Sequence, residues 1–303
     1  VLWRVGLGEG GGKLLRAGKF ASQPTYCDGR LYVVVMHVER YFVACLDADS
    51  GRPLWETPIG QAPTLSDPYR YAMPAFGLVD RCSPPAVADG RVVALTNSGV
   101  AVALEADSGR PLWATHYDSA LNRSVSSDYR GYADIHALSS RSVNPVVVMS
   151  GRVVCLPADS DELLSLSLAD GRRLWGVSRA GQHDLAAVDA GRLLLSGPGL
   201  RIVDAKDGSL IHESKSATNI LGRPAVTPRR ILASGDGMVY ALDLERCELS
   251  QLGLASARGM LGNLVSSGEV LVAANAAGVS AYVDFDSVRG RLGERIERAG
   301  PPE

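Results

Sequence analysis

The sequence predicts an all-β protein, a β-propeller of four-stranded antiparallel blades, on three observations. The octapeptide ADSGRPLW occurs at residues 48–55 and again, unchanged, at residues 106–113, which indicates an internal repeat. Around it, apolar and polar residues alternate as in half-buried strands, and Asp-Ser-Gly or Asp-Gly steps supply hairpin turns. The later repeats end at Trp175, His212 and Gln251, and their spacing of roughly 40 residues is the length of one propeller blade.

The repeated unit is longer than the octapeptide and recurs along the chain. Residues 41–57 (YFVACLDADSGRPLWET) match residues 99–115 (GVAVALEADSGRPLWAT). Looser copies lie at residues 163–178, 199–214, 237–252 and 278–287. Each copy supplies two strands, and the short inner strand and apolar run before it supply two more. We expect inner strands near residues 20–26, 83–88, 144–149, 185–188, 223–227 and 261–266.

The inner strands predict six blades, or seven or eight if the chain belongs to a larger ring. We expect a single propeller domain over residues 1–286 and a C-terminal tail over residues 287–303. Residues 1–5 (VLWRV) match the end of a repeat. We expect them to supply the outermost strand of the last blade, which would remove the free sheet edges. Residues 291–296 are the alternative fourth strand of that blade.

Composition limits the classes of partner. The chain has 31 basic and 33 acidic residues and a net charge of −2, which argues against a nucleic-acid-binding surface. No apolar run approaches the ~20 residues that span a bilayer, so no transmembrane segment is expected in this chain, and no leader is recognisable in it. The five cysteines are scattered, without a paired motif, which favours buried free thiols.

The pattern apolar-x-Ala-Leu-Asp-Ala-x-Ser/Thr-Gly-x-x-Leu-Trp resembles the pyrroloquinoline-quinone-like (PQQ-like) propeller repeat, from Trp3 to about Asp286. The resemblance implies that each repeat tryptophan docks between neighbouring blades, where an indole buries ~150–250 Å² and its N–H finds a backbone carbonyl. The blade-docking tryptophans are Trp3, Trp55, Trp113 and Trp175. His212 and Gln251 stand where the motif has tryptophan, so we expect the later blades to pack more weakly or to be filled differently.

The same resemblance implies a function. The family includes quinoprotein alcohol dehydrogenases, a propeller lipoprotein of the outer-membrane β-barrel assembly machinery, and sensor regions of bacterial kinases. This chain has neither adjacent cysteines nor a Cys-x-x-Cys-His motif, so we expect a non-catalytic scaffold in the bacterial periplasm or cell envelope, with no catalytic residue, cofactor or metal. The alternatives are a PQQ- and calcium-dependent dehydrogenase, or a degenerate relative of one, and the sensor propeller of a larger signalling protein.

Binding is expected on the loops, because the blades are scaffold. Residues 58–82 and 116–143 form long connections from an outermost strand to the next inner strand, as residues 6–19 do, and such connections share one rim. Both long insertions pair tyrosine with arginine, residue types enriched at binding hot spots. The predicted surface for a protein or small ligand is Tyr69, Arg70, Tyr71, Tyr129, Arg130 and Tyr132. Alternatively, these tyrosines pin each insertion to the blade beneath it.

Three further motifs are weaker. Residues 158–162 (ADSDE) lack the glycine and register of a calcium loop, and we expect a solvated turn. Residues 8–13 (GEGGGK) lack the spacing of a Walker motif, and we expect a flexible linker. A metal site near the second insertion would require the convergence of His116, Asp118, Asp134 and His136.

Overall fold

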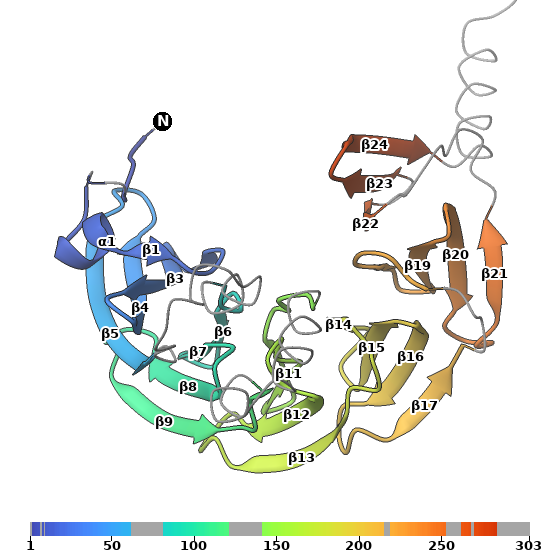
Figure 1. Ribbon diagram of the computed structural model, residues 1–303, viewed down its shortest axis with the longest axis horizontal. Helices are drawn as coiled ribbons and strands as arrows, with labels where there is room; N and C mark the ends of the chain where they lie inside the picture. The colour runs from blue at the N-terminus through green and yellow to red at the C-terminus, as the bar shows by residue number, and fades with distance from the viewer. Residues whose placement is uncertain are drawn as a thin grey trace, which may run out of the picture. The chain divides into compact units, whose positions relative to one another are not determined.

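The computed structural model describes residues 2–6, 8, 10–61, 81–120, 141–214, 219–252, 262–267 and 270–283. These residues form six antiparallel sheets that follow one another along the chain, as the blades of a propeller do (Figure 1). The predicted all-β propeller fold is confirmed, and the number of sheets is consistent with six blades. The chain divides into two compact units, and the first consists of Val1–Leu185 and Asp204–Ser209.

The first unit contains three sheets. The strands of the first are β1 (Lys19–Phe20), β2 (Thr25–Cys27), β3 (Arg30–His37), β4 (Arg40–Asp47) and β5 (Pro53–Gln61). Those of the second are β6 (Ala86–Ala88), β7 (Arg91–Leu95), β8 (Val100–Glu105) and β9 (Pro111–His116). Those of the third are β10 (Val147–Met149), β11 (Arg152–Cys155), β12 (Glu162–Ser167) and β13 (Arg173–Ser178). In each sheet the strands lie in sequence order, and β1 and β2 together occupy the inner position of the first sheet.

The second unit consists of Ala186–Val203 and Leu210–Glu303. It holds most of the fourth sheet, with β14 (Asp184–Ala187), β15 (Arg192–Gly197), β16 (Gly199–Asp204) and β17 (Leu210–Glu213). The fifth sheet has β18 (Ala225–Val226), β19 (Arg230–Gly235), β20 (Met238–Asp243) and β21 (Leu249–Leu252). The last sheet has three strands among the described residues, β22 (Asn263–Ser267), β23 (Val270–Asn275) and β24 (Gly278–Val283). Each expected inner strand is present.

The core lies between the sheets. One buried cluster joins the first and second sheets and includes Val34 and Val92, and another joins the second and third and includes Leu95 and Leu164. Because both faces of a middle strand are covered, strands such as β3 consist of apolar runs, with Val33, Val34 and Val35 all buried. The five-residue helix α1 (Lys13–Ala17) covers the other face of the first sheet, with Leu15 fully buried.

The repeat tryptophans join each sheet to the turn of the next one. Each indole N–H donates to a backbone carbonyl after the third strand of the following sheet, Trp55 to Ala106 at 3.0 Å, Trp113 to Leu168 at 3.0 Å and Trp175 to Ala205 at 3.2 Å. The ring lies over the turn glycine, so closely that a Cβ on Gly109 or Gly171 would sit 2.5 Å from it. Both glycines also have positive φ, +71° and +72°, which disfavours other residues. Each ring thus contacts the following sheet at the position that the sequence resemblance assigns to it.

A β-bulge before each tryptophan explains the rest of the repeated octapeptide. Trp113 pairs with Ala103 and Pro111 with Leu104, so Leu112 has no partner in the ladder and points outward. An extra residue of this kind bends the strand and re-aims the side chain that follows. The strand pairing shifts by one residue in the same way before Trp55 and before Trp175. Two residues after Trp113, the Thr115 hydroxyl donates to the Gly171 carbonyl at 2.7 Å, a second link to the same turn.

The interface between the fourth and fifth sheets is filled differently, as expected from the absence of a tryptophan at position 212. His212 replaces tryptophan on β17, and its buried Nε2 has no hydrogen-bond partner. The Leu244 carbonyl is at the position that accepts an indole N–H in the earlier sheets. Here it accepts a hydrogen bond from Arg192 Nη1 at 3.4 Å. Cys247 stands in place of the turn glycine with a φ of 55°. The two sheets therefore meet without the ring-on-glycine contact.

The N-terminal segment uses the same contact. Trp3 Nε1 donates to the Ala48 carbonyl at 3.0 Å, and a Cβ on Gly51 would lie 2.5 Å from its ring. Trp3 thus docks on the first sheet as the other three tryptophans dock on theirs. Residues 2–5 are not part of a strand. That residues 1–5 complete the last blade, and that one domain extends to residue 286, stay predictions.

Replacing Trp113 by alanine should lower the free energy of unfolding by about 3–5 kcal/mol, because the change removes a large buried side chain and leaves a cavity. The neighbouring Leu112→Ala is the matched control, since Leu112 is 36% exposed and Trp113 9%. Urea unfolding followed by circular dichroism measures both. Equal losses in the two variants would contradict the docking role of the tryptophan.

Candidate functional site

Two kinds of connection meet at one rim of the second and third sheets. In an antiparallel sheet, the loop between the two middle strands leaves the same end as the connection that follows the outermost strand. The structure shows this for the second sheet, where the Tyr117 N–H after β9 donates to the Gly99 carbonyl between β7 and β8 at 3.0 Å. The long connection that starts at Tyr117 therefore shares its rim with the loops over residues 96–99 and 156–161.

The sequence predicts a binding surface on the two long insertions and a candidate metal site near the second. Tyr69, Arg70, Tyr71, Tyr129, Arg130 and Tyr132 lie outside the described residues, as do Asp134 and His136. His116 and Asp118 are exposed on either side of the buried Tyr117. Within the part of the chain that the structure describes, no three His, Cys, Asp or Glu side chains gather to hold a metal ion.

The structure instead brings together a group of polar residues on this rim, at the end of the first insertion and at both ends of the second. We call it the root cluster. Its members are Asn97, Tyr117, Arg141, Asn144, Asp159, Ser160, Arg179 and Gln182. All except Arg141 are buried. They come from loops and connections of the second and third sheets, and all belong to the first unit.

The centre of the root cluster is the loop between β11 and β12. We expected residues 158–162 to be a solvated turn, and this is wrong for Asp159 and Ser160, which are 0% and 1% exposed. Side chains from three connections cover them. Asp161 alone of the three acids in this segment has a largely exposed side chain, and it forms an ion pair with Arg141.

This loop holds both ends of the second insertion. At its start, the Tyr117 hydroxyl donates to Asp159 Oδ1 at 2.9 Å, and the Ala120 N–H donates to the Asp159 carbonyl at 2.7 Å. At its end, Arg141 Nη1 donates to the Ser160 carbonyl at 2.8 Å. The segment over residues 121–140 therefore leaves and rejoins the described structure at the same loop.

The end of the first insertion is connected to the same loop through Asn97. Asn97 Nδ2 donates to the Arg81 carbonyl at 3.0 Å, and Asn97 Oδ1 accepts from the Ala158 N–H at 3.3 Å. Next to Arg81, the Cys82 N–H donates to the Ala21 carbonyl at 2.7 Å. The described end of the first insertion and both described ends of the second therefore lie on one rim.

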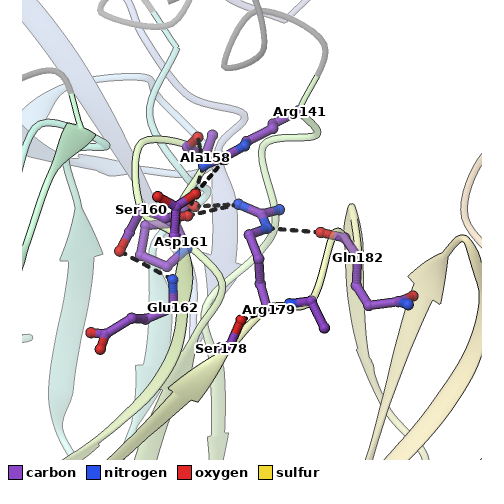
Figure 2. A network of polar contacts seen from close by, with 10 residues as sticks. Arg141, Ala158, Ser160, Asp161, Glu162, Ser178, Arg179 and Gln182 are labelled. Carbon is purple, nitrogen blue, oxygen red and sulfur yellow. Dashed lines mark hydrogen bonds and ion pairs between the residues drawn. The ribbon is translucent and has the colours of Figure 1, made fainter. Parts of the chain in front are cut away.

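Arg179 supports the loop from the other side (Figure 2). Figure 2 shows Arg141 and Arg179 approaching the Ala158–Asp161 segment from different connections. Arg179 Nη1 donates to the carbonyls of Pro157 and Ser160, both at 3.0 Å, and its Nε donates to the Gln182 carbonyl at 2.8 Å. Burial disfavours its charge, and with the nearby Arg141 charge it lowers the pKa of Arg179 to about 10.

Asp159 is the second buried charge of the root cluster. Burial raises the pKa of its carboxyl group from 3.8 to about 6, against the opposing effects of the Ser119 and Tyr117 hydroxyls. Its second oxygen, Oδ2, has no hydrogen-bond partner. Arg179 lies nearby, but its hydrogen bonds go to carbonyl oxygens. Asp159 is therefore a carboxylate with little to compensate its charge.

The root cluster is a positioning device. Its arginine and asparagine side chains are bound mainly to backbone carbonyls and amides of the connections, where they fix the course of the chain. Asn144, for example, donates to the His183 carbonyl and accepts from the Leu185 N–H, both at 2.9 Å. Sequence reasoning missed these residues. The one signal was the length of the loop over residues 156–161, which exceeds the two-residue turn between β3 and β4.

The fold and the repeat define the chain as a propeller of the PQQ-like class. A family model described as outer membrane protein assembly factor BamB matches residues 1–175 and 160–282, so the chain belongs to the BamB family. The BamB of Yersinia pestis is 26% identical over 273 residues, which are 88% of this chain and 62% of that protein. The chain thus spans less than two thirds of this relative. The resemblance stated from the sequence is confirmed.

Solved structures show the same fold. BamB from Moraxella catarrhalis superposes with a TM-score of 0.58 and 15% identity, covering 87% of this chain and 72% of that one. The quinohemoprotein alcohol dehydrogenase of Comamonas testosteroni superposes with a TM-score of 0.53 and 13% sequence identity. The match covers 85% of this chain and 52% of that one. At these identities the likeness concerns the fold alone. Among the described residues, no helix has the length and apolar character needed to cross a membrane.

Replacing Asp159 by asparagine should stabilise the protein at neutral pH. The native pKa of this carboxyl group is raised to about 6, so its contribution to stability is fully present below pH 3.8 and is lost as the pH rises through 6. The cost of ionisation reaches about 3 kcal/mol at pH 7. Asparagine carries no charge and can still accept from Tyr117.

Urea unfolding at pH 4.5 and 7.5 measures this difference. The wild type should lose stability between the two values, and Asp159→Asn should lose less. Asp161→Asn, in the same loop but exposed, should follow the wild type. The explanation fails if Asp159→Asn shows the wild-type pH dependence.

Proposed function

We propose that this chain is a non-catalytic propeller that binds a protein partner on the rim carrying the two long insertions, and that it does so in the bacterial cell envelope. The partner class is a protein of outer-membrane protein assembly. The surface consists of the sequence-predicted residues Tyr69, Arg70, Tyr71, Tyr129, Arg130 and Tyr132.

The observation that carries this proposal is the root cluster. Burying Asp159 and Arg179 is costly, because each charge loses its hydration. A fold that needed only short connections would not require this, as the two-residue turn between β3 and β4 illustrates. Here the buried groups hold Ala120, Arg141 and Arg81, the residues that flank the insertions. Their position supports a role in presenting the insertions in a defined way.

Membership of the BamB family supports the class of partner and the compartment. The family description names an outer membrane protein assembly factor, and a protein that takes part in assembly must contact other proteins. The quinohemoprotein dehydrogenases share the fold with this chain. No residue arrangement described above favours their reaction over binding.

Site-specific photo-crosslinking tests the surface directly. A photoreactive amino acid in place of Tyr69 or Tyr129, in protein produced in the envelope of a Gram-negative host, should capture a defined envelope protein that mass spectrometry identifies as an assembly component. The control positions are Asp49 and Ser108, which are exposed in turns at the opposite rim. Equal crosslinking at the control positions, or partners unrelated to assembly, would refute the proposal.

The double substitution Arg70→Ala with Arg130→Ala should weaken capture of that partner by about tenfold or more, because arginines at hot spots commonly contribute over 1 kcal/mol each. Arg52→Ala with Arg110→Ala is the matched control, since these exposed arginines occupy equivalent positions of the octapeptide. Binding affinity and thermal unfolding are measured for both. Unchanged affinity of the first variant would remove the two arginines from the surface.

A further inference from the structure

We infer that the root cluster makes the anchorage of the second insertion proton-dependent, with Asp159 as the responsive group. Uptake of a proton by Asp159 tightens the attachment of residues 117–120 to the loop between β11 and β12, and loss of the proton loosens it. The link from this anchorage to partner capture rests on the proposed function. The anchorage itself stands on the described residues alone.

The geometry makes Asp159 the point on which the start of the insertion depends. Its side chain accepts from the Tyr117 hydroxyl at 2.9 Å, and its backbone carbonyl accepts from the Ala120 N–H at 2.7 Å. Tyr117 and Ala120, three positions apart in the sequence, are therefore both held by one residue. Displacement of the whole Asp159 residue towards solvent would break both hydrogen bonds, and rotation of its side chain would break the bond to Tyr117.

The groups around Asp159 leave its charge largely uncompensated. Tyr117 from the end of β9 is a neutral donor, and the pKa of its hydroxyl is raised well above the ordinary value because it is buried. Arg179 directs its Nη1 and Nε to carbonyls. The other ionisable groups of the described connections near the cluster are Arg141, Asp161, His183 and Asp184, together with Cys155 at the end of β11.

Arg141 does not supply the missing charge either. Its Nη2 pairs with Asp161, and its Nη1 donates to the carbonyls of Ser160 and Ala158. Asp159 Oδ2 is buried and has no hydrogen-bond partner. The ionised carboxylate is therefore stabilised by the neutral hydroxyls of Ser119 and Tyr117 and not by a hydrogen-bonded cation among the described residues, whereas exposure to water would solvate it fully. Ionisation thus favours an open state in which Asp159 leaves the cluster.

The size of the effect follows from proton linkage. With a carboxyl pKa of about 6 in the anchored state and 3.8 in an opened, solvated state, the opening equilibrium increases about tenfold from pH 5.0 to pH 7.5. Below pH 3.8 both states are protonated, and well above pH 6 both are ionised. The transition therefore lies in the mildly acidic range, where local opening can change without global unfolding.

Hydrogen exchange of the full chain, read by mass spectrometry on peptides covering residues 117–120, tests the anchorage without any partner. Protection factors, corrected for the intrinsic pH dependence of exchange, should fall about tenfold from pH 5.0 to pH 7.5 in the wild type. They should stay constant in Asp159→Asn. Asp161→Asn removes an exposed carboxylate from the same loop and should keep the wild-type pH dependence.

A second experiment measures partner capture, with the photoreactive amino acid at position 129 in the otherwise wild-type protein and in Asp159→Asn. Crosslinking should be at least twofold higher at pH 5.0 than at pH 7.5 in the wild type, and equal at both values in Asp159→Asn. Crosslinking without a pH difference, while exchange at residues 117–120 does change, overturns the regulation and leaves the proposed function intact.

Protection that does not respond to pH, or responds equally in Asp159→Asn, overturns the inference at its first step. Absence of crosslinking at either pH, with exchange behaving as expected, rejects the proposed function and the regulation of capture, while it supports the proton-dependent anchorage. The two failures are therefore distinguishable.

Discussion

The contact of a tryptophan ring with the turn glycine of the following sheet is the interaction on which the rest of this structure depends. It occurs with Trp3, Trp55, Trp113 and Trp175, each bonded to a carbonyl at the same point of the repeat. The ring needs a residue without a Cβ beneath it, and the turn needs a residue that tolerates positive φ. Glycine meets both requirements, which is why the octapeptide keeps Gly and Trp together although they contact different repeats.

Because sheets are joined at this edge, the opposite rim is left to carry the long connections. The root cluster shows how the chain uses that rim. Buried polar groups that contribute little net stability hold the end of the first insertion and both ends of the second at one loop. Asn97, Asp159 and Ser160 each bind a residue next to an insertion. This arrangement supports the proposed binding on the rim, and the ionisation of Asp159 is the proposed way to adjust it.

The features predicted from sequence are those encoded within one repeat. Trp113 and Gly171 were recognisable because the same letters recur, and their contact follows from repetition of one blade. The departure at His212 was also visible, but not that Arg192 takes over the carbonyl of Leu244. The root cluster escaped prediction because the burial of Asp159 depends on Tyr117 and Arg179, which reach it from connections far apart in the sequence. Three acidic residues in a short segment predict an exposed turn only if no other part of the chain packs over them.

A double-mutant cycle between Trp113 and Gly171 tests the account most directly. Gly171→Ala, Trp113→Ala and the double variant are compared with the wild type by urea unfolding. If the ring occupies the space above the glycine, Gly171→Ala should be strongly destabilising when Trp113 is present. Without the ring it should cost less, about 1 kcal/mol for the unfavourable φ together with the displacement of the Thr115 hydroxyl, which would lie 2.7 Å from the new Cβ. The account predicts a coupling energy of about 1–3 kcal/mol, and additive effects of the two substitutions would contradict it.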